Sequence, residues 1–392
     1  MLNCFYWYAA IWTFILVLYH FNISSFNMTL DPALFIFLVL TIMISLFLGI
    51  IFKKNFKFIY KEGIPKNLNK KVWAIVAGYI IEFVYAGYIP LISIAITKTN
   101  IYTEFPGIPI FHVILNGLTS FYAIKIAYYA ICNKNERKKL VKMYIILMFM
   151  FLLMYYRSML VINIFMVLLL FIAYLQSEKK IKIKHYIIML FSILIMCYIY
   201  GGIGNIRDGY KWNDNSYIEK LGMYRTYPSI IPKQYMWTYS YLTTPLANLN
   251  YNVLNNQINY DTLGFVKNII PNFLSKRLNI NNNANETLLI RTYFNATTGW
   301  TGIYLNSGIE GMYIMYFIIT FIIVFVLYHC QQKENNQKYE NNTIILAILC
   351  VIVIFMFFYN TLSYVGTSLM FYIALISLIA QKNKRVKIKN ER

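Results

Sequence analysis

Long apolar runs recur along the whole chain and are separated by short polar loops. Runs of about 20 residues match the thickness of a bilayer, so they predict membrane-crossing helices. The predicted helices cover residues 5–23, 31–52, 72–97, 109–131, 143–156, 158–175, 186–203, 303–329, 343–359 and 362–380. The pattern therefore predicts an all-α polytopic membrane protein with about ten transmembrane helices. The first run has no basic region before it, which predicts a retained helix rather than a cleaved signal.

The run from 143 to 175 is apolar except for Arg157 near its middle. As one helix it would be about 50 Å long, whereas the hydrocarbon core of a bilayer is about 30 Å thick. A guanidinium at the centre of a bilayer is also unfavourable by several kcal/mol. Both flanks are basic, and short basic loops stay on the cytoplasmic side. The run therefore predicts two helices that fold back at Tyr156 and Arg157, with the arginine at the outer surface.

The basic residues indicate which loops face the cytoplasm. Most of the 36 Lys and Arg residues lie in the loops at 53–71, 132–142, 176–186, 331–342 and 381–392. Three short loops of the opposite parity hold only Lys98. Both termini are therefore predicted to be cytoplasmic. The predicted organisation is helices one to seven in 1–203, a large periplasmic loop of short helices in 204–302, and helices eight to ten with a basic cytoplasmic tail in 303–392.

The composition supports a membrane protein and changes how the charge is interpreted. The chain has 392 residues, of which 59% are hydrophobic and 13% are charged, and its mean hydropathy is +0.52. A net charge of +21 would suggest a nucleic-acid partner in a soluble protein. Here the basic residues lie mostly in short loops and orient the protein, so no nucleic-acid partner is predicted. None of the five cysteines lies in 204–302, so no disulfide framework is predicted there.

The predicted outer side lacks the usual catalytic donors and is rich in arginine. The loop at 204–302 has no His or Cys, which excludes zinc chemistry and Ser–His or Cys–His catalysis within it. Guanidinium groups suit bidentate phosphate recognition and stabilise a departing diphosphate. The outer arginines are Arg157, Arg207, Arg225, Arg277 and Arg291. A surface or ion-pair role is the alternative for each, but Arg157 and Arg207 lie beside apolar runs, at the depth of a lipid phosphate.

A few other ionisable groups are candidates. Glu310 opens the eighth predicted helix on the outer side, where it could orient a sugar hydroxyl, accept its proton or pair with an arginine. Glu82 and Lys125, in the third and fourth helices, are predicted to be internal partners or snorkelling groups. The four histidines lie at or near helix ends and are predicted to snorkel. No metal and no cofactor are predicted.

Three stretches carry a family resemblance. They are YYRSML at the predicted hairpin, YMWTYSYLTTPLANLNYNV at 235–253, and RTYFNATTGWTGIYLNSGIEGMYIMYFI at 291–318. Together with the topology they resemble the Wzy-type O-antigen polymerases of Gram-negative inner membranes. The third stretch has Asn306 where that family usually has an acid, and the family's Arg-x10-Gly spacing occurs from Arg291 to Gly302.

The resemblance implies a substrate and a reaction. The fold would be GT-C-like, and the substrate would be undecaprenyl diphosphate carrying a short oligosaccharide in the periplasmic leaflet. The enzyme would transfer the growing glycan from its carrier to the non-reducing-end hydroxyl of the next lipid-linked unit. Because this donor has a good leaving group, positive charge on the diphosphate should be the largest catalytic contribution. The implied partners are membrane lipid, a chain-length regulator and a flippase, without a cofactor.

The candidate site combines the outer cations with the family-like segments. The candidate catalytic residues are Arg157, Arg207, Arg291 and Glu310. The candidate substrate-binding residues are Arg225, Arg277, Asp208, Trp237, Tyr239, Tyr241, Asn248 and Asn306. The aromatic residues of the outer segment could instead form an interfacial belt.

Two alternatives remain at this point. An O-antigen ligase has a similar topology and uses a lipid-diphosphate donor, but ligases of that kind usually carry a histidine in the large outer loop, and this loop has none. A flippase or other transporter lines a central cavity with intramembrane charges, and only Glu82 and Lys125 favour that class.

Overall fold

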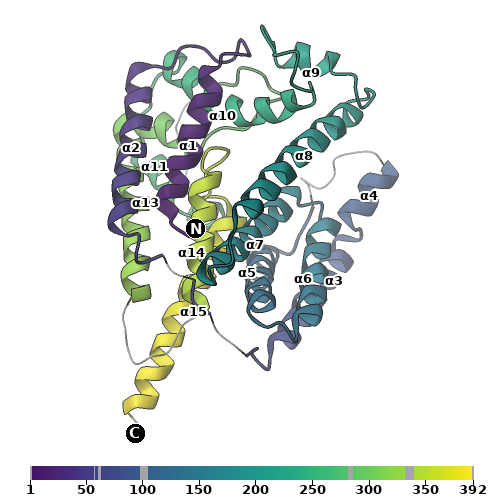
Figure 1. Ribbon diagram of the computed structural model, residues 1–392, viewed down its shortest axis with the longest axis vertical. Coiled ribbons are helices and arrows are strands. Elements are labelled where there is room, and N and C mark those ends of the chain that lie inside the picture. The colour runs from purple at the N-terminus through teal and green to yellow at the C-terminus, as the bar shows by residue number, and fades with distance from the viewer. Residues whose placement is uncertain are drawn as a thin grey trace.

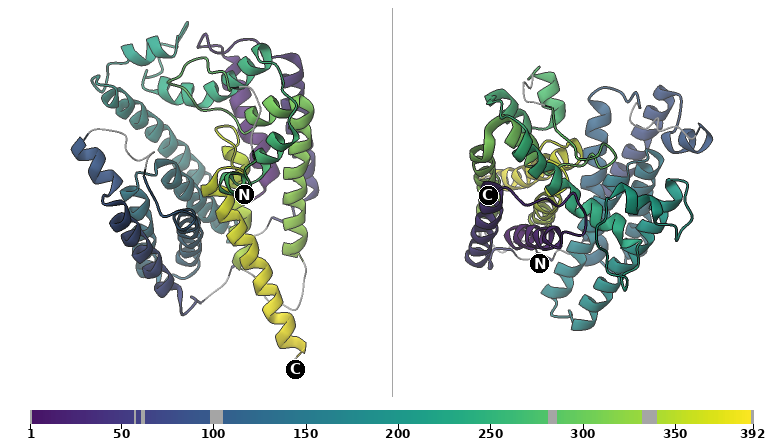
Figure 2. Two further views of the ribbon diagram at one scale, coloured as in Figure 1. Left: turned by 180° about the vertical axis from the view of Figure 1, so that it is seen from behind. Right: turned by 90° about the horizontal axis from the view of Figure 1, so that it is seen from above.

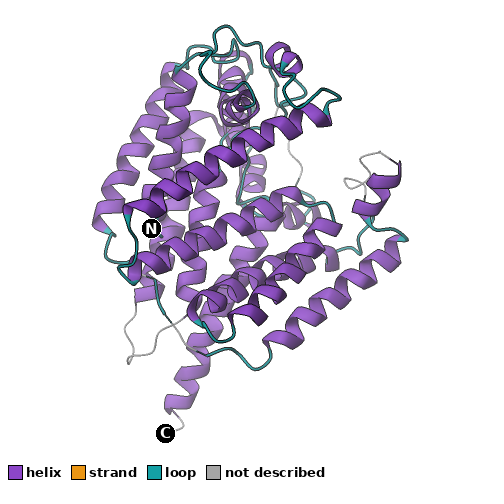
Figure 3. Ribbon diagram, turned by 45° about the vertical axis from the view of Figure 1, so that its right-hand side comes forward, coloured by secondary structure: helices purple, strands orange, loops and turns teal. Residues whose placement is uncertain are grey.

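The computed structural model describes residues 2–56, 58–60, 63–97, 105–280, 286–331 and 340–390. Within these ranges every regular element is an α-helix, which confirms the all-α prediction (Figure 3). The first eight helices are α1 (Cys4–His20), α2 (Pro32–Ile51), α3 (Leu68–Ala86), α4 (Pro90–Thr97), α5 (Phe111–Cys132), α6 (Arg137–Leu153), α7 (Arg157–Ser177) and α8 (Ile183–Arg207). The remaining ones are α9 (Ser216–Leu221), α10 (Tyr235–Asn255), α11 (Thr262–Ile269), α12 (Asn272–Arg277), α13 (Thr301–Gln331), α14 (Glu340–Phe355) and α15 (Val365–Asn390).

Several helices have the length and composition of membrane spans. Four of the described helices are long and apolar enough to cross a bilayer, namely α2, α7, α8 and the Thr301–His329 part of α13. Three shorter apolar helices lie at Cys4–His20, Asn341–Phe355 and Val365–Ala380. Their exposed apolar side chains, such as Phe47 (62% exposed) and Phe321 (69% exposed), are suited to lipid rather than water. The chain is therefore a helical membrane protein.

The helices form two groups joined by the C-terminal pair. In the view from above in Figure 2, α1, α2 and α13 lie on one side and α3, α5 and α6 on the other, with α14 and α15 between them. Helices α9 and α10 lie at one end of the molecule, and the C-terminal end of α15 projects from the opposite end (Figure 1). Helix α8 crosses the bundle obliquely and packs mainly on α10.

Two apolar runs are interrupted where the backbone leaves the helical conformation. The predicted helix 72–97 is broken between α3 and α4, because Gly87 adopts φ = 77° and caps α3 by donating its amide to Phe83 O at 2.9 Å. The run 143–175 is broken as predicted, since α6 ends at Leu153 and α7 begins at Arg157. Tyr155 lies between them with φ = 59°, a conformation that turns the chain back on itself.

The segment predicted to be a loop of short helices contains one long helix. Helices α9, α11 and α12 are short, but α10 has 21 residues and most of its side chains are buried against α1, α8 and α13. It was not predicted because it is rich in Asn, Thr and Tyr and carries Pro245 in its interior.

Asparagine side chains of α10 form hydrogen bonds with backbone groups of neighbouring segments. Asn250 accepts the Asp31 amide at 2.9 Å and donates to Thr29 O at 3.0 Å. Asn252 accepts the Leu288 amide at 2.9 Å and donates to Leu288 O at 2.8 Å. These polar side chains are buried because each satisfies backbone groups that would otherwise have no partner.

Candidate functional site

The C-terminal end of α8 carries an arginine held on an aromatic surface. The guanidinium of Arg207 lies 5.2 Å from the ring centroid of Trp237 and 5.6 Å from that of Tyr293. Its Nη2 is 3.1 Å from Asp208 Oδ2 and also donates to the Tyr293 hydroxyl. The side chain is still 39% exposed. Arg207 is thus fixed in position by cation–π and ionic contacts while part of it stays open to a ligand.

Residues at the C-terminal end of α8 position the Trp237 ring that supports Arg207. Gly204 lets the Trp237 ring approach the helix, because a Cβ there would lie 2.8 Å from the indole Cε2. Asn205 accepts the Trp237 indole N–H at 2.7 Å and donates to Trp212 O and to Asn215 Oδ1, each at 2.9 Å. Trp237 is fully buried, so its indole forms part of the support for Arg207.

Tyr293 connects the arginine to its counterion. Its hydroxyl donates to Asp208 Oδ2 at 2.7 Å. Burial raises the pKa of Tyr293 well above its usual range, the hydrogen bond to Asp208 acts in the same direction, and Arg207 opposes both. The hydroxyl therefore stays protonated and donating at neutral pH.

Arg157 begins α7, directly after the turn that follows α6. It is exposed, its guanidinium lies 4.9 Å from the Tyr155 ring centroid, and it has no ion pair within the described residues. Arg157 and Arg207 are both near enough to the Tyr200 hydroxyl for their charges to act on it. The Tyr200 ring lies 5.7 Å from that of Tyr241, beside Arg207. We call Arg157, Arg207, Tyr200, Trp237, Tyr241 and Tyr293 the arginine–aromatic cluster.

The other predicted arginines make no described contact with this cluster. Arg291 is exposed and places Nη2 3.3 Å from the sulfur of Met223. Arg225 is exposed and is held through its backbone amide, which donates to Ile23 O at 2.9 Å. Arg277 is exposed at the end of α12. The charges of Arg157 and Arg207 thus both act on Tyr200, whereas the other three arginines have no described contact with the cluster.

Glu310 and Asn306 lie at a break in α13. Gly308 interrupts the helix with φ = 64° and ψ = −165°. Asn306 is buried, donates its amide to Gly302 O at 2.6 Å and accepts the Asp261 amide at its backbone oxygen at 2.9 Å. Glu310 is exposed and forms no ion pair in the described part of the chain, so the arginine partner considered for it is not observed.

Some predicted substrate-binding side chains are instead used inside the protein. Tyr239 is 7% exposed, and its hydroxyl donates to Leu18 O at 3.1 Å. Asn248 is fully buried, donates to Phe294 O and Ala296 O, each at 2.9 Å, and accepts the Ile290 amide at 3.1 Å. Both residues, like Trp237, support the site rather than line it.

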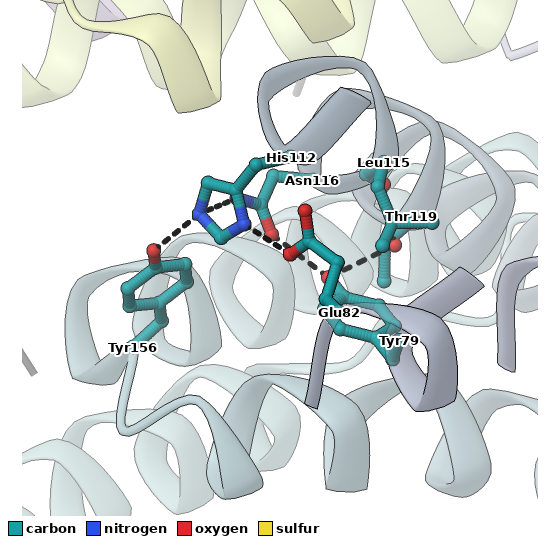
Figure 4. Close-up of polar contacts among 7 residues, drawn as sticks. All are labelled: Tyr79, Glu82, His112, Leu115, Asn116, Thr119 and Tyr156. Carbon is teal, nitrogen blue, oxygen red and sulfur yellow. Dashed lines mark hydrogen bonds and ion pairs between the residues drawn. The ribbon is translucent and has the colours of Figure 1, made fainter. Parts of the chain in front are cut away.

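A buried network that the sequence analysis did not predict lies next to Arg157. Glu82 of α3 is fully buried and is bonded to His112 Nδ1 of α5, and His112 Nε2 is 2.7 Å from the Tyr156 hydroxyl (Figure 4). Tyr156 directly precedes Arg157. His112 was predicted to snorkel, but the structure directs its ring towards Glu82, because α3 and α5 pack against each other.

Two further side chains orient this network. Asn116, one turn after His112, places its amide nitrogen 3.0 Å from His112 Nε2, and Tyr79 donates to Asn116 Oδ1 at 2.8 Å (Figure 4). The His112 side chain is 18% exposed. The prediction that Glu82 has an internal partner is confirmed, and the only signal for it in the sequence was an acid in an apolar helix. Lys125 lies elsewhere and donates to Asn341 Oδ1 at 3.5 Å.

A cavity of about 800 Å³ lies where α5 ends and α6 begins. Its lining comes from two basic connections and includes Lys66, Lys134, Glu136 and Lys139. None of the cluster residues and none of the Glu82–His112–Tyr156 network lines it. Within the described residues no group of three His, Cys, Asp or Glu side chains could hold a metal ion.

The chain was compared with known families, curated proteins and solved structures. No family model matches it, and no curated protein or solved structure matches it significantly. The function is therefore argued from the site itself.

Proposed function

We propose that this protein is a glycosyltransferase that polymerises lipid-diphosphate-linked oligosaccharide repeat units, as the Wzy-type O-antigen polymerases do. The observation that carries the proposal is Arg207, which is held on the rings of Trp237 and Tyr293 and still has part of its guanidinium exposed. Arg157 is exposed and has no ion pair within the described residues, and Arg207 keeps part of its guanidinium open.

Two guanidinium groups suit a diphosphate leaving group, because each can form charge-assisted hydrogen bonds with phosphate oxygens. When the bond between the anomeric carbon and the phosphate oxygen breaks, negative charge develops on that oxygen, and fixed donors stabilise it without reorganising. The support of Arg207 by Trp237 and Tyr293 provides such fixation. The tyrosine rings of the cluster also present flat apolar faces, against which sugar rings can pack.

The site also fits a substrate that reaches it from the membrane. Arg207 ends α8, a helix with the length and hydropathy of a membrane span, and Arg157 begins α7, another such helix. We propose a layout of ten crossings made by α1, α2, α3 with α4, α5, α6, α7, α8, α13, α14 and α15, in the bacterial inner membrane. Both termini would be cytoplasmic, and residues 204–302 would lie in the periplasm, where a flippase delivers the substrate and a chain-length regulator docks.

The proposal is tested with purified protein in lipid nanodiscs and a synthetic undecaprenyl-diphosphate oligosaccharide. We expect wild-type protein to form glycan ladders, and Arg157→Ala and Arg207→Ala each to lower kcat by about 10²–10³-fold, the usual effect of removing one electrostatic donor. Lys220→Ala, which removes an exposed cation of α9 outside the cluster, serves as the matched control and should keep wild-type activity. Full ladders from both arginine variants would contradict the proposal.

Deletion of the gene separates the proposed function from its alternatives. A polymerase deletion leaves lipopolysaccharide capped with a single repeat unit. Loss of all O-antigen would identify a ligase, and accumulation of lipid-linked units facing the cytoplasm would identify a flippase.

A further inference from the structure

The buried network beside Arg157 joins three elements that are distant in the chain. Glu82 comes from α3, His112 from α5, and Tyr156 from the turn between α6 and α7 (Figure 4). We infer that Tyr156, His112 and Glu82 form a proton relay that removes the proton from the attacking sugar hydroxyl. This inference rests on the proposed function and adds the group that activates the acceptor.

The hydrogen bonds of His112 allow the ring to gain and lose a proton without moving. In the neutral form, Nδ1–H donates to Glu82 and Nε2 accepts from the Tyr156 hydroxyl. In the protonated form, Nδ1–H still donates to Glu82, while Nε2–H donates to the Tyr156 oxygen. Because Tyr156 can donate or accept over the same 2.7 Å, the relay needs a shift of protons and a small turn of the Asn116 amide, whose nitrogen lies 3.0 Å from Nε2 and cannot accept.

Glu82 holds the His112 ring through the nitrogen that does not face Tyr156. The carboxyl is fully buried, and its Oε1 has no hydrogen-bond partner among the described residues. The bond between Glu82 Oε2 and His112 Nδ1 fixes the orientation and the tautomer of the imidazole ring, so Glu82 acts as a positioning residue.

The relay ends where the diphosphate site begins. Tyr156 directly precedes Arg157, and the next residue, Ser158, has its hydroxyl 3.3 Å from that of Tyr364. The Tyr156 hydroxyl and the hydroxyl pair of Ser158 and Tyr364 therefore belong to residues on either side of Arg157 in the chain. An acceptor sugar whose hydroxyl contacts Tyr156 would stand next to a donor whose phosphates contact Arg157.

The chemical step balances without any other reactant. The acceptor O–H bond breaks, and its electron pair forms the new bond to the anomeric carbon of the donor. The bond from that carbon to the phosphate oxygen breaks, and the lipid diphosphate leaves with the electron pair, beside Arg157 and Arg207. The acceptor proton moves to the Tyr156 oxygen while the Tyr156 proton moves to His112 Nε2, from which it is later released to water.

The test measures kcat and KM of the nanodisc-embedded protein with the synthetic lipid-linked oligosaccharide as donor and acceptor. We expect His112→Gln and Tyr156→Phe each to lower kcat by about 10²-fold or more with KM changed by less than about threefold. Glu82→Gln should lower kcat by about tenfold, because the neutral amide balances less charge. A purely structural role would instead change KM and the amount of folded protein together.

Two controls separate chemistry from packing. Tyr79→Phe removes the hydroxyl that orients Asn116 in the same network, so it should lower kcat less than His112→Gln does. His329→Gln alters a half-buried histidine that is bonded to Phe325 O within α13, far from the network in the chain, and it should have no effect. If Tyr156→Phe and His112→Gln fold and keep full kcat while Arg157→Ala is inactive, the relay is wrong and the proposed function stands. If wild-type protein forms no glycan, both are wrong.

Discussion

The two arginines of the cluster differ in how firmly they are held. Arg207 is fixed between Trp237, Tyr293 and Asp208, whereas Arg157 has only the Tyr155 ring as a described partner. A donor that is already fixed stabilises developing charge with little reorganisation, while an unpaired one gains the most from binding an anion. Arg207 is thus suited to the transition state and Arg157 to the capture of the phosphates.

This difference predicts the effect of removing the Tyr293 hydroxyl. Tyr293→Phe keeps the ring under Arg207 but deletes the bond to Asp208, so the guanidinium loses part of its fixation. One such hydrogen bond contributes about 1 kcal/mol, which corresponds to about a fivefold lower kcat. Steady-state kinetics with the lipid-linked oligosaccharide measures it, and Tyr210→Phe, a neighbouring tyrosine outside the cluster, is the control. An unchanged kcat would show that Asp208 alone fixes Arg207.

At the scale of single residues, charged candidate residues were easier to recognise in the sequence than the contacts between side chains. Arg157 and Arg207 were recognisable because each guanidinium borders an apolar run. The pairing of Glu82 with His112 was not, because it depends on how α3 and α5 align, and no local pattern encodes that alignment. Asn248 was expected to bind substrate, but a buried amide serves the backbone equally well, and sequence does not distinguish the two uses.

Helix α13 is interrupted at Gly308, whose backbone dihedral angles are not helical. The break at Gly308 frees the carbonyls of Leu305 and Asn306, which accept the amides of Asn259 and Asp261 at 3.2 and 2.9 Å. A Cβ at Gly308 would lie 2.7 Å from Glu310 Oε2 and 3.2 Å from Ile258 Cδ1. The kink therefore attaches the connection before α11 to α13 and depends on the absence of a side chain.

Gly308→Ala is expected to destabilise this junction by about 1–3 kcal/mol, since a non-glycine residue is strained in that conformation. The midpoint of thermal unfolding in detergent should fall, and limited proteolysis should cut sooner near residues 256–261. Ser307→Ala is the matched control, because it changes the adjacent residue without altering the backbone requirement. If Gly308→Ala unfolds at the wild-type temperature, the kink is not under strain.

The helices themselves were predictable to the extent that they are apolar. Hydropathy located the long apolar helices and the break at Arg157, because lipid requires continuous apolar side chains there. It did not locate α10, whose buried face is made of asparagines and threonines rather than leucines. A polar helix inside a protein has no hydropathy signal, since its partners are backbone groups of other segments.

The whole molecule has two ends of different character. One end carries α9 and α10, while the C-terminal end of α15 projects from the other (Figure 1). The sequence suggests an orientation because Lys and Arg concentrate in the loops predicted to be cytoplasmic.

The orientation is tested by labelling introduced cysteines with a membrane-impermeant thiol reagent in intact spheroplasts. Arg225→Cys, in the exposed connection between α9 and α10, should be labelled, whereas Lys182→Cys, before α8, should react only after permeabilisation. Of the native cysteines whose side chains the structure describes, Cys4, Cys132 and Cys350 are buried, so the suitable background replaces Cys197 by Ser, together with Cys330, whose side chain lies outside the described part. Labelling of position 182 but not 225 would reverse the orientation and place the cluster on the wrong side for the proposed substrate.

The asparagines of α10 also limit when the folded site can form during protein synthesis. Asn250 binds Thr29 and Asp31, which the ribosome makes early, and Asn248 binds the backbone at 290–296, which it makes late. Helix α10 can therefore complete its contacts only after residues 290–296 have been translated, and the Trp237 and Tyr293 support for Arg207 assembles only afterwards. Nascent chains stalled before residue 290 should be inserted yet lack a formed site.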